Sequence, residues 1–146
     1  MREILFRGKC KYNGKWIEGC LVKLGRESFS DPERYGICNK AVPLGGSGVC
    51  YNLKIDEIVP ETVGQYTGLT DKNGKKIFEG DVIKCISRFD AKDMVVIFEK
   101  AEFHLVDCQR YKNYTECCGY RYFGTLETEV IGNIHDNPEL LKGGEG

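Results

Sequence analysis

The sequence predicts a mainly β protein, built from small bent sheets or β-barrels, with one short helical turn close to the C-terminus. Glycine makes up 18 of the 146 residues and lies between short apolar runs, a pattern typical of strands joined by tight turns. Asn-Gly pairs at positions 13–14 and 73–74 mark two of these turns. Asn137 followed by Pro138 predicts that a helical turn begins there.

The first predicted element is a hairpin of strands 4–12 and 15–24, joined by a two-residue turn at Asn13 and Gly14. This register places Cys10 opposite Ile17 and puts Cys10 and Cys20 on opposite faces of the sheet. Further strands are expected near residues 35–39, 49–53, 55–59, 82–88, 93–98, 101–107, 119–124 and 127–134.

The length fits a single domain, residues 1–146, which could consist of two related β-lobes, 1–60 and 61–146. The stretch 13–23 has a similar counterpart at 73–84, which is one residue longer. Duplication and the chance repetition of a turn followed by a strand explain this echo equally well. The Gly-rich tail at 143–146 is expected to be disordered.

Composition excludes several classes of protein. With 41 % hydrophobic and 29 % charged residues, the chain is globular rather than disordered. Its net charge of −1 excludes binding to nucleic acid by bulk charge alone. No apolar run approaches the length of a membrane span, and the charges within residues 1–7 argue against a signal peptide. We therefore expect a cytoplasmic protein that does not contact a membrane.

The eight cysteines form no recognisable metal motif. No pair has the C-x-x-C spacing, and the chain has only two histidines, so we predict neither a metal site nor a cofactor. Reduced thiols that fill half-buried strand positions account for these residues. The adjacent Cys117 and Cys118 could be oxidised or bind a soft metal, so a metal- or thiol-site protein is kept as an alternative.

No enzyme signature is present either. The sequence lacks a Ser nucleophile elbow, a phosphate loop and a dinucleotide-binding fingerprint. Cys108 and His104, the nearest Cys–His pair, would lie about 13 Å apart on one strand, too far for the His to activate the thiol. We predict a non-enzymatic protein without catalytic residues.

Basic and aromatic side chains gather in two segments. The first lies in the N-terminal hairpin and consists of Arg7, Lys9, Lys11, Tyr12, Lys15 and Trp16. The second consists of Arg110, Tyr111, Lys112, Tyr114, Tyr120, Arg121 and Tyr122. Small β-barrels bind single-stranded nucleic acid with such residues, and Tyr and Arg are also favoured anchors of protein interfaces. Both segments are therefore candidate surfaces for nucleic acid or for a partner protein.

Four segments carry a family resemblance: Arg2–Gly8, Asn13–Gly19, Val63–Ile83 and Glu129–Leu141. They resemble the opening, central and closing motifs of the YopX family of phage and prophage proteins. The resemblance implies a phage or prophage origin, a mostly β fold and the bacterial cytoplasm as the setting. It implies no catalytic residues and no role for the cysteines.

Together these observations predict a phage-encoded, non-enzymatic binding or adaptor protein that acts on a host or phage protein in the infected cell. A single-stranded nucleic-acid-binding β-barrel is the alternative. Because short edge strands pair readily between copies, we also expect a homo-oligomer.

Overall fold

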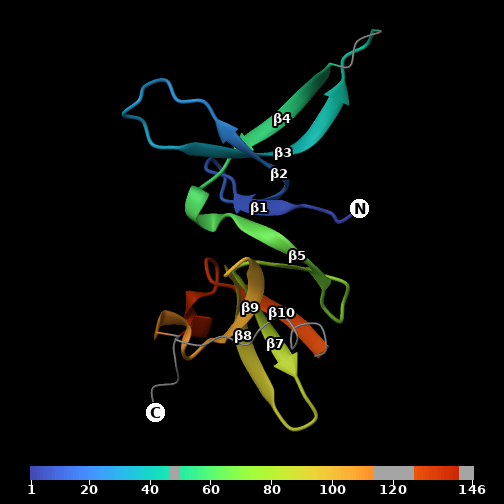
Figure 1. Ribbon diagram of the computed structural model, residues 1–146, viewed down its shortest axis with the longest axis vertical. Helices are drawn as coiled ribbons and strands as arrows, with labels where there is room; N and C mark the ends of the chain where they lie inside the picture. The colour runs from blue at the N-terminus through green and yellow to red at the C-terminus, as the bar shows by residue number, and fades with distance from the viewer. Residues whose placement is uncertain (47–49, 114–126, 142–146) are drawn as a thin grey trace. The chain divides into compact units, whose positions relative to one another are not determined.

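The structure, a computed structural model, describes residues 1–46, 50–113 and 127–141 and is mainly β, as predicted (Figure 1). It divides into two compact units, Met1–Gln65 and Tyr66–Gly146, so the boundary lies five residues beyond Pro60. The strand predicted near 119–124, the adjacent Cys117 and Cys118, and the tail at 143–146 lie outside the described residues.

The first unit is an antiparallel sheet in the order β4-β3-β2-β1-β5. Its apolar core is small, because within the described part of this unit only Ile37, Ile58 and Cys10 are buried apolar side chains, at 0, 1 and 4 % exposure. The elements are β1 (Phe6–Lys9), β2 (Trp16–Leu24), β3 (Arg34–Pro43), β4 (Tyr51–Glu57), the 3-10 helix η1 (Pro60–Thr62) and the start of β5 (Gly64–Thr70).

The predicted register of the first hairpin is wrong by two residues. Gly8, not Cys10, lies opposite Ile17, and a four-residue loop replaces the two-residue turn. A two-residue turn of the expected type needs a positive φ at both Asn13 and Gly14, and only Gly14 has one, at 67°. A shift of two residues preserves the alternation of faces. Cys10 and Cys20 therefore lie on opposite faces, as predicted.

Strand β4 runs without a break through Lys54, where two separate strands were predicted. The irregularity lies instead in its partner β3, where a bulge between Cys38 and Lys40 lets one strand carry an extra residue. Because β4 itself stays regular, its side chains alternate strictly between the two faces from Tyr51 to Glu57.

The end of β4 folds back onto the chain that follows β1. The Lys11 N–H donates to the Glu57 carbonyl at 2.9 Å, and the Val59 N–H donates to the Lys9 carbonyl at 2.9 Å. These bonds bend the sheet, but no closed barrel forms among the described residues, so of the two predicted forms the structure has the bent sheet. From Tyr51 to Asp56, β4 pairs only with β3 within the described ranges.

The second unit contains a four-stranded antiparallel sheet in the order β10-β7-β8-β9, and the remainder of β5 pairs with β6. The predicted C-terminal helical turn is present as η3. The elements are β6 (Lys76–Phe78), β7 (Asp81–Ile86), β8 (Ala91–Glu99), β9 (Glu102–Asp107), η2 (Tyr111–Asn113), β10 (Glu127–Asn133) and η3 (Pro138–Leu141).

The second unit has a much larger core than the first. Alternate side chains of β7, β8 and β9 point to the two faces of the sheet and pack into two apolar clusters. The larger cluster contains Ile77, Ile83, Cys85, Met94, Val96, Phe103 and Leu105. The smaller contains Val82, Val95 and Cys108, with η3 residues Leu140 and Leu141 packed against it.

A buried carboxylate connects the β5–β6 turn to β10 within this unit. Asp71 is 6 % exposed, and its Oδ1 accepts hydrogen bonds from the backbone N–H groups of Asn73 and Lys75 at 2.8 and 2.9 Å. Its Oδ2 accepts from the Val130 N–H at 3.0 Å. Burial raises the pKa of Asp71, but the three N–H donors outweigh burial and leave the pKa below its ordinary value.

The similar stretches 13–23 and 73–84 share a structure only at their start. Gly14 and Gly74 both adopt positive φ, 67° and 80°, in turns that lead into strands. The first segment then continues as the long strand β2. The second stops at Phe78, turns at Gly80 (φ 84°) and starts again as β7.

Candidate binding surface

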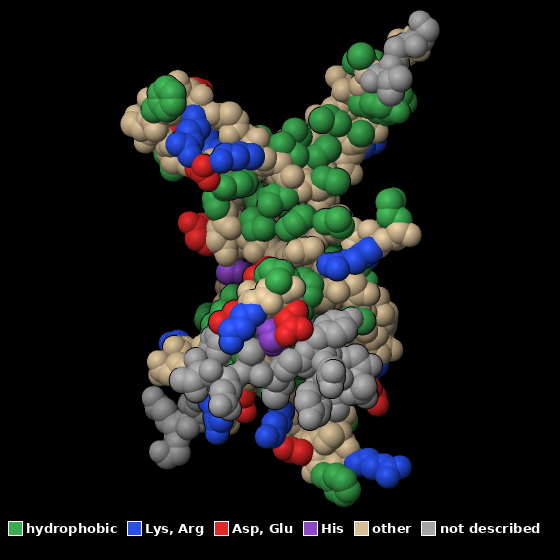
Figure 2. All heavy atoms as spheres, in the orientation of Figure 1, with side chains coloured by type: hydrophobic (Ala, Val, Ile, Leu, Met, Phe, Trp, Pro, Cys, Tyr) green, Lys and Arg blue, Asp and Glu red, His purple; other side chains and the backbone are tan. Residues whose placement is uncertain are grey.

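One face of the first unit carries a continuous set of apolar side chains, which the described part of the unit leaves half-buried or exposed. Residues that pair directly across strands share a face, so the register assigns these side chains to one side of β2, β3 and β4. We call this set the apolar face: Cys20, Val22, Leu24, Cys38, Ala41, Pro43, Tyr51, Leu53 and Ile55. Figure 2 shows hydrophobic side chains gathered over the β3–β4 hairpin and the adjoining strands of this unit.

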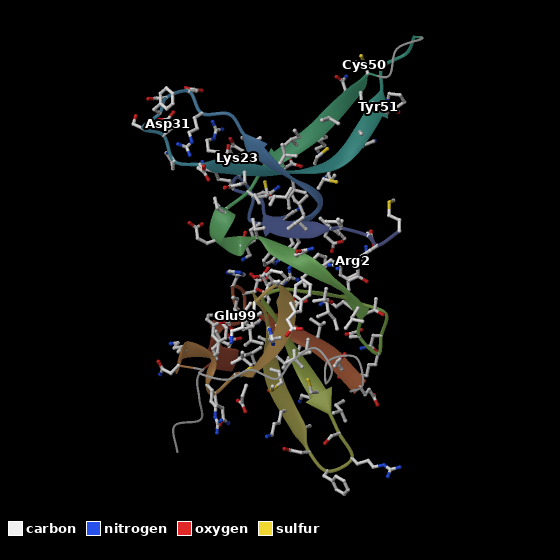
Figure 3. All side chains as sticks on the ribbon, viewed as in Figure 1. Arg2, Lys23, Asp31, Cys50, Tyr51 and Glu99 are labelled. Atoms are coloured by element: carbon white, nitrogen blue, oxygen red, sulfur yellow. The ribbon has the colours of Figure 1, made fainter. Side chains whose placement is uncertain are left out.

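The outer part of the apolar face is the most exposed. Tyr51, Leu53 and Ile55 are 52, 55 and 36 % exposed, although a folded sheet usually buries residues of this kind. Figure 3 places Tyr51 and Cys50 at the outer end of the β3–β4 hairpin. The hairpin therefore projects its apolar side chains beyond the small core of the unit.

A glycine brings the inner part of the apolar face together. A Cβ atom at Gly36 would lie 2.5 Å from Ile55 Cγ2 and 3.5 Å from Leu24 Cδ2. Glycine at this position lets the side chains of β2 and β4 approach each other over the backbone of β3. The same contacts confirm that Leu24 and Ile55 lie on one face.

The opposite face of the outer hairpin is mainly polar. Lys40 pairs with Lys54, and Val42 pairs with Asn52, on the side away from Leu53. The hairpin is thus amphipathic. Its apolar side is exposed to solvent, which in a monomeric protein marks an interaction surface more often than chance exposure does.

A cluster of ion pairs borders the apolar face. Glu57, which is 8 % exposed, accepts hydrogen bonds from Arg34 at 2.7 and 3.0 Å and from Lys11 Nζ at 3.1 Å. The Arg34 bond, followed by the Lys11 bond, lowers the pKa of Glu57 from 4.5 to about 2. Glu57 thus holds both cations, Arg34 and Lys11, in ion pairs at the border of the apolar face.

The first predicted basic–aromatic segment is only partly assembled. Arg7 and Lys9 lie over the ring of Trp16, with their cationic groups 4.7 and 5.5 Å from the ring centroid. These cations already stack on Trp16, which makes it a poor platform for a nucleic-acid base. Tyr12 is 81 % exposed in the β1–β2 loop, and Lys15 is exposed beside it.

The second predicted segment lies in the other unit and divides into buried and exposed parts. Tyr111 is half-buried against the smaller core cluster, and burial raises the pKa of its hydroxyl. Arg110 and Lys112 are exposed beside it. The other four residues of that segment, Tyr114, Tyr120, Arg121 and Tyr122, lie outside the described residues.

The chemistry of Cys108 does not suit a nucleophile. Its thiol is 4 % exposed, and burial, followed by the charges of Asp93 and Asp107, raises its pKa to about 12. A reactive cysteine needs the opposite shift, because the thiolate is the attacking species. His104 bonds through Nε2 to the Glu99 carbonyl at 3.0 Å. An open hollow of about 630 Å³ beside Cys108 is lined by both acidic and basic side chains.

The described ranges meet the requirements of neither a metal site nor a membrane-spanning helix. Within them, no group of three or more His, Cys, Asp and Glu side chains is arranged to hold a metal ion. The same ranges contain no helix with the length and hydropathy that a membrane crossing requires.

The apolar face was missed by the sequence analysis. Its signal is the alternation Tyr51-Asn52-Leu53-Lys54-Ile55-Asp56, which marks an amphipathic strand. The pairing of Cys20 with Cys38 on that face could not be found in the same way, because it depends on the register between β2 and β3.

Comparison with known proteins identifies the family. The chain is similar in structure to protein EF1440 from Enterococcus faecalis, with a TM-score of 0.58 and 24 % sequence identity over 97 % of this chain and 100 % of that one. This likeness supports the fold. Among curated proteins, none matches the chain. The sequence model of the YopX protein family matches residues 5–142, nearly the whole chain, and the chain therefore belongs to the YopX family.

Proposed function

We propose that this YopX-family chain is a phage- or prophage-encoded, non-enzymatic binding or adaptor protein, whose apolar face binds a partner protein in the bacterial cell. The observation that carries the proposal is the exposure of Tyr51, Leu53 and Ile55 on one side of an amphipathic hairpin. Burial of such side chains is worth about 25 cal/mol per Å² of apolar surface, so a partner with a matching apolar surface gains directly from covering them.

The charges around the apolar face favour a protein over a nucleic acid as the partner. Arg34 and Lys11 at its border are paired with Glu57, so they are not available to neutralise phosphates without breaking those bonds. Arg7 and Lys9 lie over the ring of Trp16, so their cationic groups already have an aromatic partner. A partner that presents apolar side chains meets no unpaired charge at the centre of this surface.

The test is affinity capture from bacterial lysate, with and without nuclease, using a matched pair of variants. Val22→Lys places a charge in the apolar face, and Val42→Lys places the same charge on the opposite face of the same sheet. We expect Val22→Lys to reduce capture of the partner at least about tenfold, because a charge would be buried on binding, and Val42→Lys to leave it unchanged. Circular dichroism checks that both variants are folded.

Two outcomes would contradict this function. Equal capture by the wild type and Val22→Lys would show that the apolar face does not bind the partner. A partner that disappears on nuclease treatment would indicate nucleic-acid binding instead.

A further inference from the structure

We propose that the free edge of β4 pairs with the same strand of a second copy of the chain, in an antiparallel register whose two-fold axis passes through Leu53. This dimer is distinct from the binding of a heterologous partner. It uses the backbone edge of β4 between Tyr51 and Ile55, whereas partner binding uses the side chains of the apolar face.

The hydrogen bonds at both ends of β4 identify which backbone groups point to the free edge. The Cys50 carbonyl accepts from the Leu44 N–H at 2.9 Å, and the Ile58 N–H donates to the Tyr35 carbonyl at 3.0 Å, so even-numbered residues point towards β3. The Glu57 carbonyl points the other way, to Lys11. Because backbone groups alternate along a strand, Tyr51, Leu53 and Ile55 direct theirs to the free edge.

This edge is of the kind that pairs with another strand. Natural sheets protect their edges with charges, bulges or prolines, and β4 has none of these at its three outward-pointing positions. Lys54 points its backbone groups inward and its side chain to the polar face. The edge is open only as far as Asp56, because Lys11 already occupies the carbonyl of Glu57.

The sequence of β4 is self-complementary in one register. A two-fold axis at Leu53 places Leu53 opposite Leu53 of the second copy and Tyr51 opposite Ile55 of the second copy, so one face of the new ladder is wholly apolar. On the other face, Asn52 lies opposite Lys54 of the second copy, which brings no like charges together. All five residues of the open edge, 51–55, are paired.

The neighbouring registers are worse. An axis at Lys54 places that side chain directly opposite Lys54 of the second copy, and directly opposed like charges destabilise a sheet. An axis at Ile55 pairs Leu53 with Glu57 of the second copy, whose carbonyl is already bonded to Lys11. An axis at Asn52 opposes no like charges but pairs only residues 51–53 of β4, against all of 51–55 for the axis at Leu53. The axis at Leu53 therefore pairs the most of the free edge without opposing like charges, and a closed two-fold dimer follows.

The proposal is tested by measuring molecular mass against concentration, from about 1 μM to about 500 μM, by analytical ultracentrifugation. The monomer mass is 16.5 kDa, and the wild type is expected to approach twice that value as concentration rises. Leu53→Pro removes the central edge N–H and keeps an apolar side chain. It loses no bond to β3, because that N–H points outward. This variant is expected to remain monomeric, whereas Val22→Lys, on a strand away from the edge, is expected to dimerise like the wild type.

A crosslink tests the register itself. Leu53→Cys is expected to give a disulfide between the two introduced thiols on mild oxidation, because they lie directly opposite each other. Asn52→Cys, which lies opposite Lys54 of the second copy, is expected to give at least about tenfold less of the corresponding product. Peptide mapping by mass spectrometry separates these crosslinks from any that involve the exposed Cys20 and Cys50.

The proposal is overturned if the wild type remains at the monomer mass throughout, or if Leu53→Pro dimerises as the wild type does. It is also overturned if Asn52→Cys crosslinks as well as Leu53→Cys. These results leave the proposed function standing, because that depends on capture by the apolar face and its sensitivity to Val22→Lys.

Discussion

The two units of this chain use similar strands for different purposes. In the second unit, β7, β8 and β9 bury apolar side chains on both faces of the sheet, in two clusters. In the first unit, β3 and β4 extend past a small core, in which three apolar side chains are buried among the described residues, and one apolar face is left largely exposed. Leu105 on β9 is 1 % exposed and Leu53 on β4 is 55 % exposed, although both are leucines on regular strands.

This difference indicates that the two units contribute differently to stability. Burial of apolar surface is the main stabilising contribution to a fold, so the second unit has the larger share of it. Exposed apolar surface contributes little to folding, and a large exposed apolar patch is typical of an interaction site. The comparison therefore assigns stability mainly to the second unit and places the surface that we propose for binding in the first.

The largest expected effect is on the free energy of unfolding, and it separates Leu105 from Leu53. Leu105→Ala leaves a cavity in the larger core cluster and should reduce the free energy of unfolding by about 2–5 kcal/mol. Leu53→Ala removes the same atoms from an exposed position and should change it by less than about 0.5 kcal/mol. Urea unfolding of dilute protein, followed by circular dichroism, measures both. Equal losses of stability in the two variants would contradict the contrast between a buried Leu105 and an exposed Leu53.

The next effect concerns the buried carboxylate of the second unit. Asp71→Asn replaces one of the two carboxylate oxygens with an NH₂ group. That group then faces either the N–H groups of Asn73 and Lys75 or the N–H group of Val130. A buried donor then faces a donor, which should cost about 1–3 kcal/mol. The same urea experiment measures it, and Asn73→Ala, an exposed change in the same turn that keeps the backbone N–H, serves as the control. A variant as stable as the wild type would show that this carboxylate does not connect the turn to β10.

The smallest effect is a dependence on pH in the first unit. Because the folded-state pKa of Glu57 is lowered to about 2 from 4.5, its ion pairs stabilise the unit above about pH 4.5. This stabilisation is lost as the pH falls from about 4.5 through about 2. Glu57→Gln should lower the midpoint of thermal unfolding at pH 7 by a few degrees and reduce its decline over that acid range.

Fluorescence of Trp16, the single Trp of the chain, reports on the first unit specifically. Glu33→Gln serves as a comparison. The bond from Lys23 also lowers the pKa of Glu33 to about 2, but Glu33 is 41 % exposed and water screens its ion pairs with Lys23 and Arg26, so a smaller change is expected. An unchanged acid profile in Glu57→Gln would mean that Glu57 does not hold Arg34 and Lys11 in place.

Much of the fold could be predicted from the sequence because turn signals and alternation are local. Asn73-Gly74 and Asn137-Pro138 correctly located a turn and a helical turn. The register at Asn13 failed because the loop type depends on the φ of two adjacent residues, which the Asn-Gly pair alone does not determine. The uninterrupted course of β4 was missed because the bulge that accommodates it lies in β3.

The candidate surface was harder to predict than the fold. The basic and aromatic residues predicted a binding surface in the first hairpin. In the structure, Arg7 and Lys9 stack on the ring of Trp16 and do not leave it open. The apolar face depends on which strands lie beside β4 and on how small the core beneath it is. Neither property can be derived from the strand pattern of a single segment, since both are set by long-range pairing.

Hydrogen exchange followed by mass spectrometry tests the central claim most directly, because it compares the two units in one unmodified protein. We expect amides in residues 94–106 of β8 and β9 to exchange slowly at every protein concentration. The outward-pointing amides of Tyr51, Leu53 and Ile55 in β4 should exchange rapidly in dilute protein and become protected as concentration rises or as the captured partner is added. If the amides of Tyr51, Leu53 and Ile55 are as slow as those of residues 94–106 in dilute protein without a partner, the edge of β4 is not open for binding.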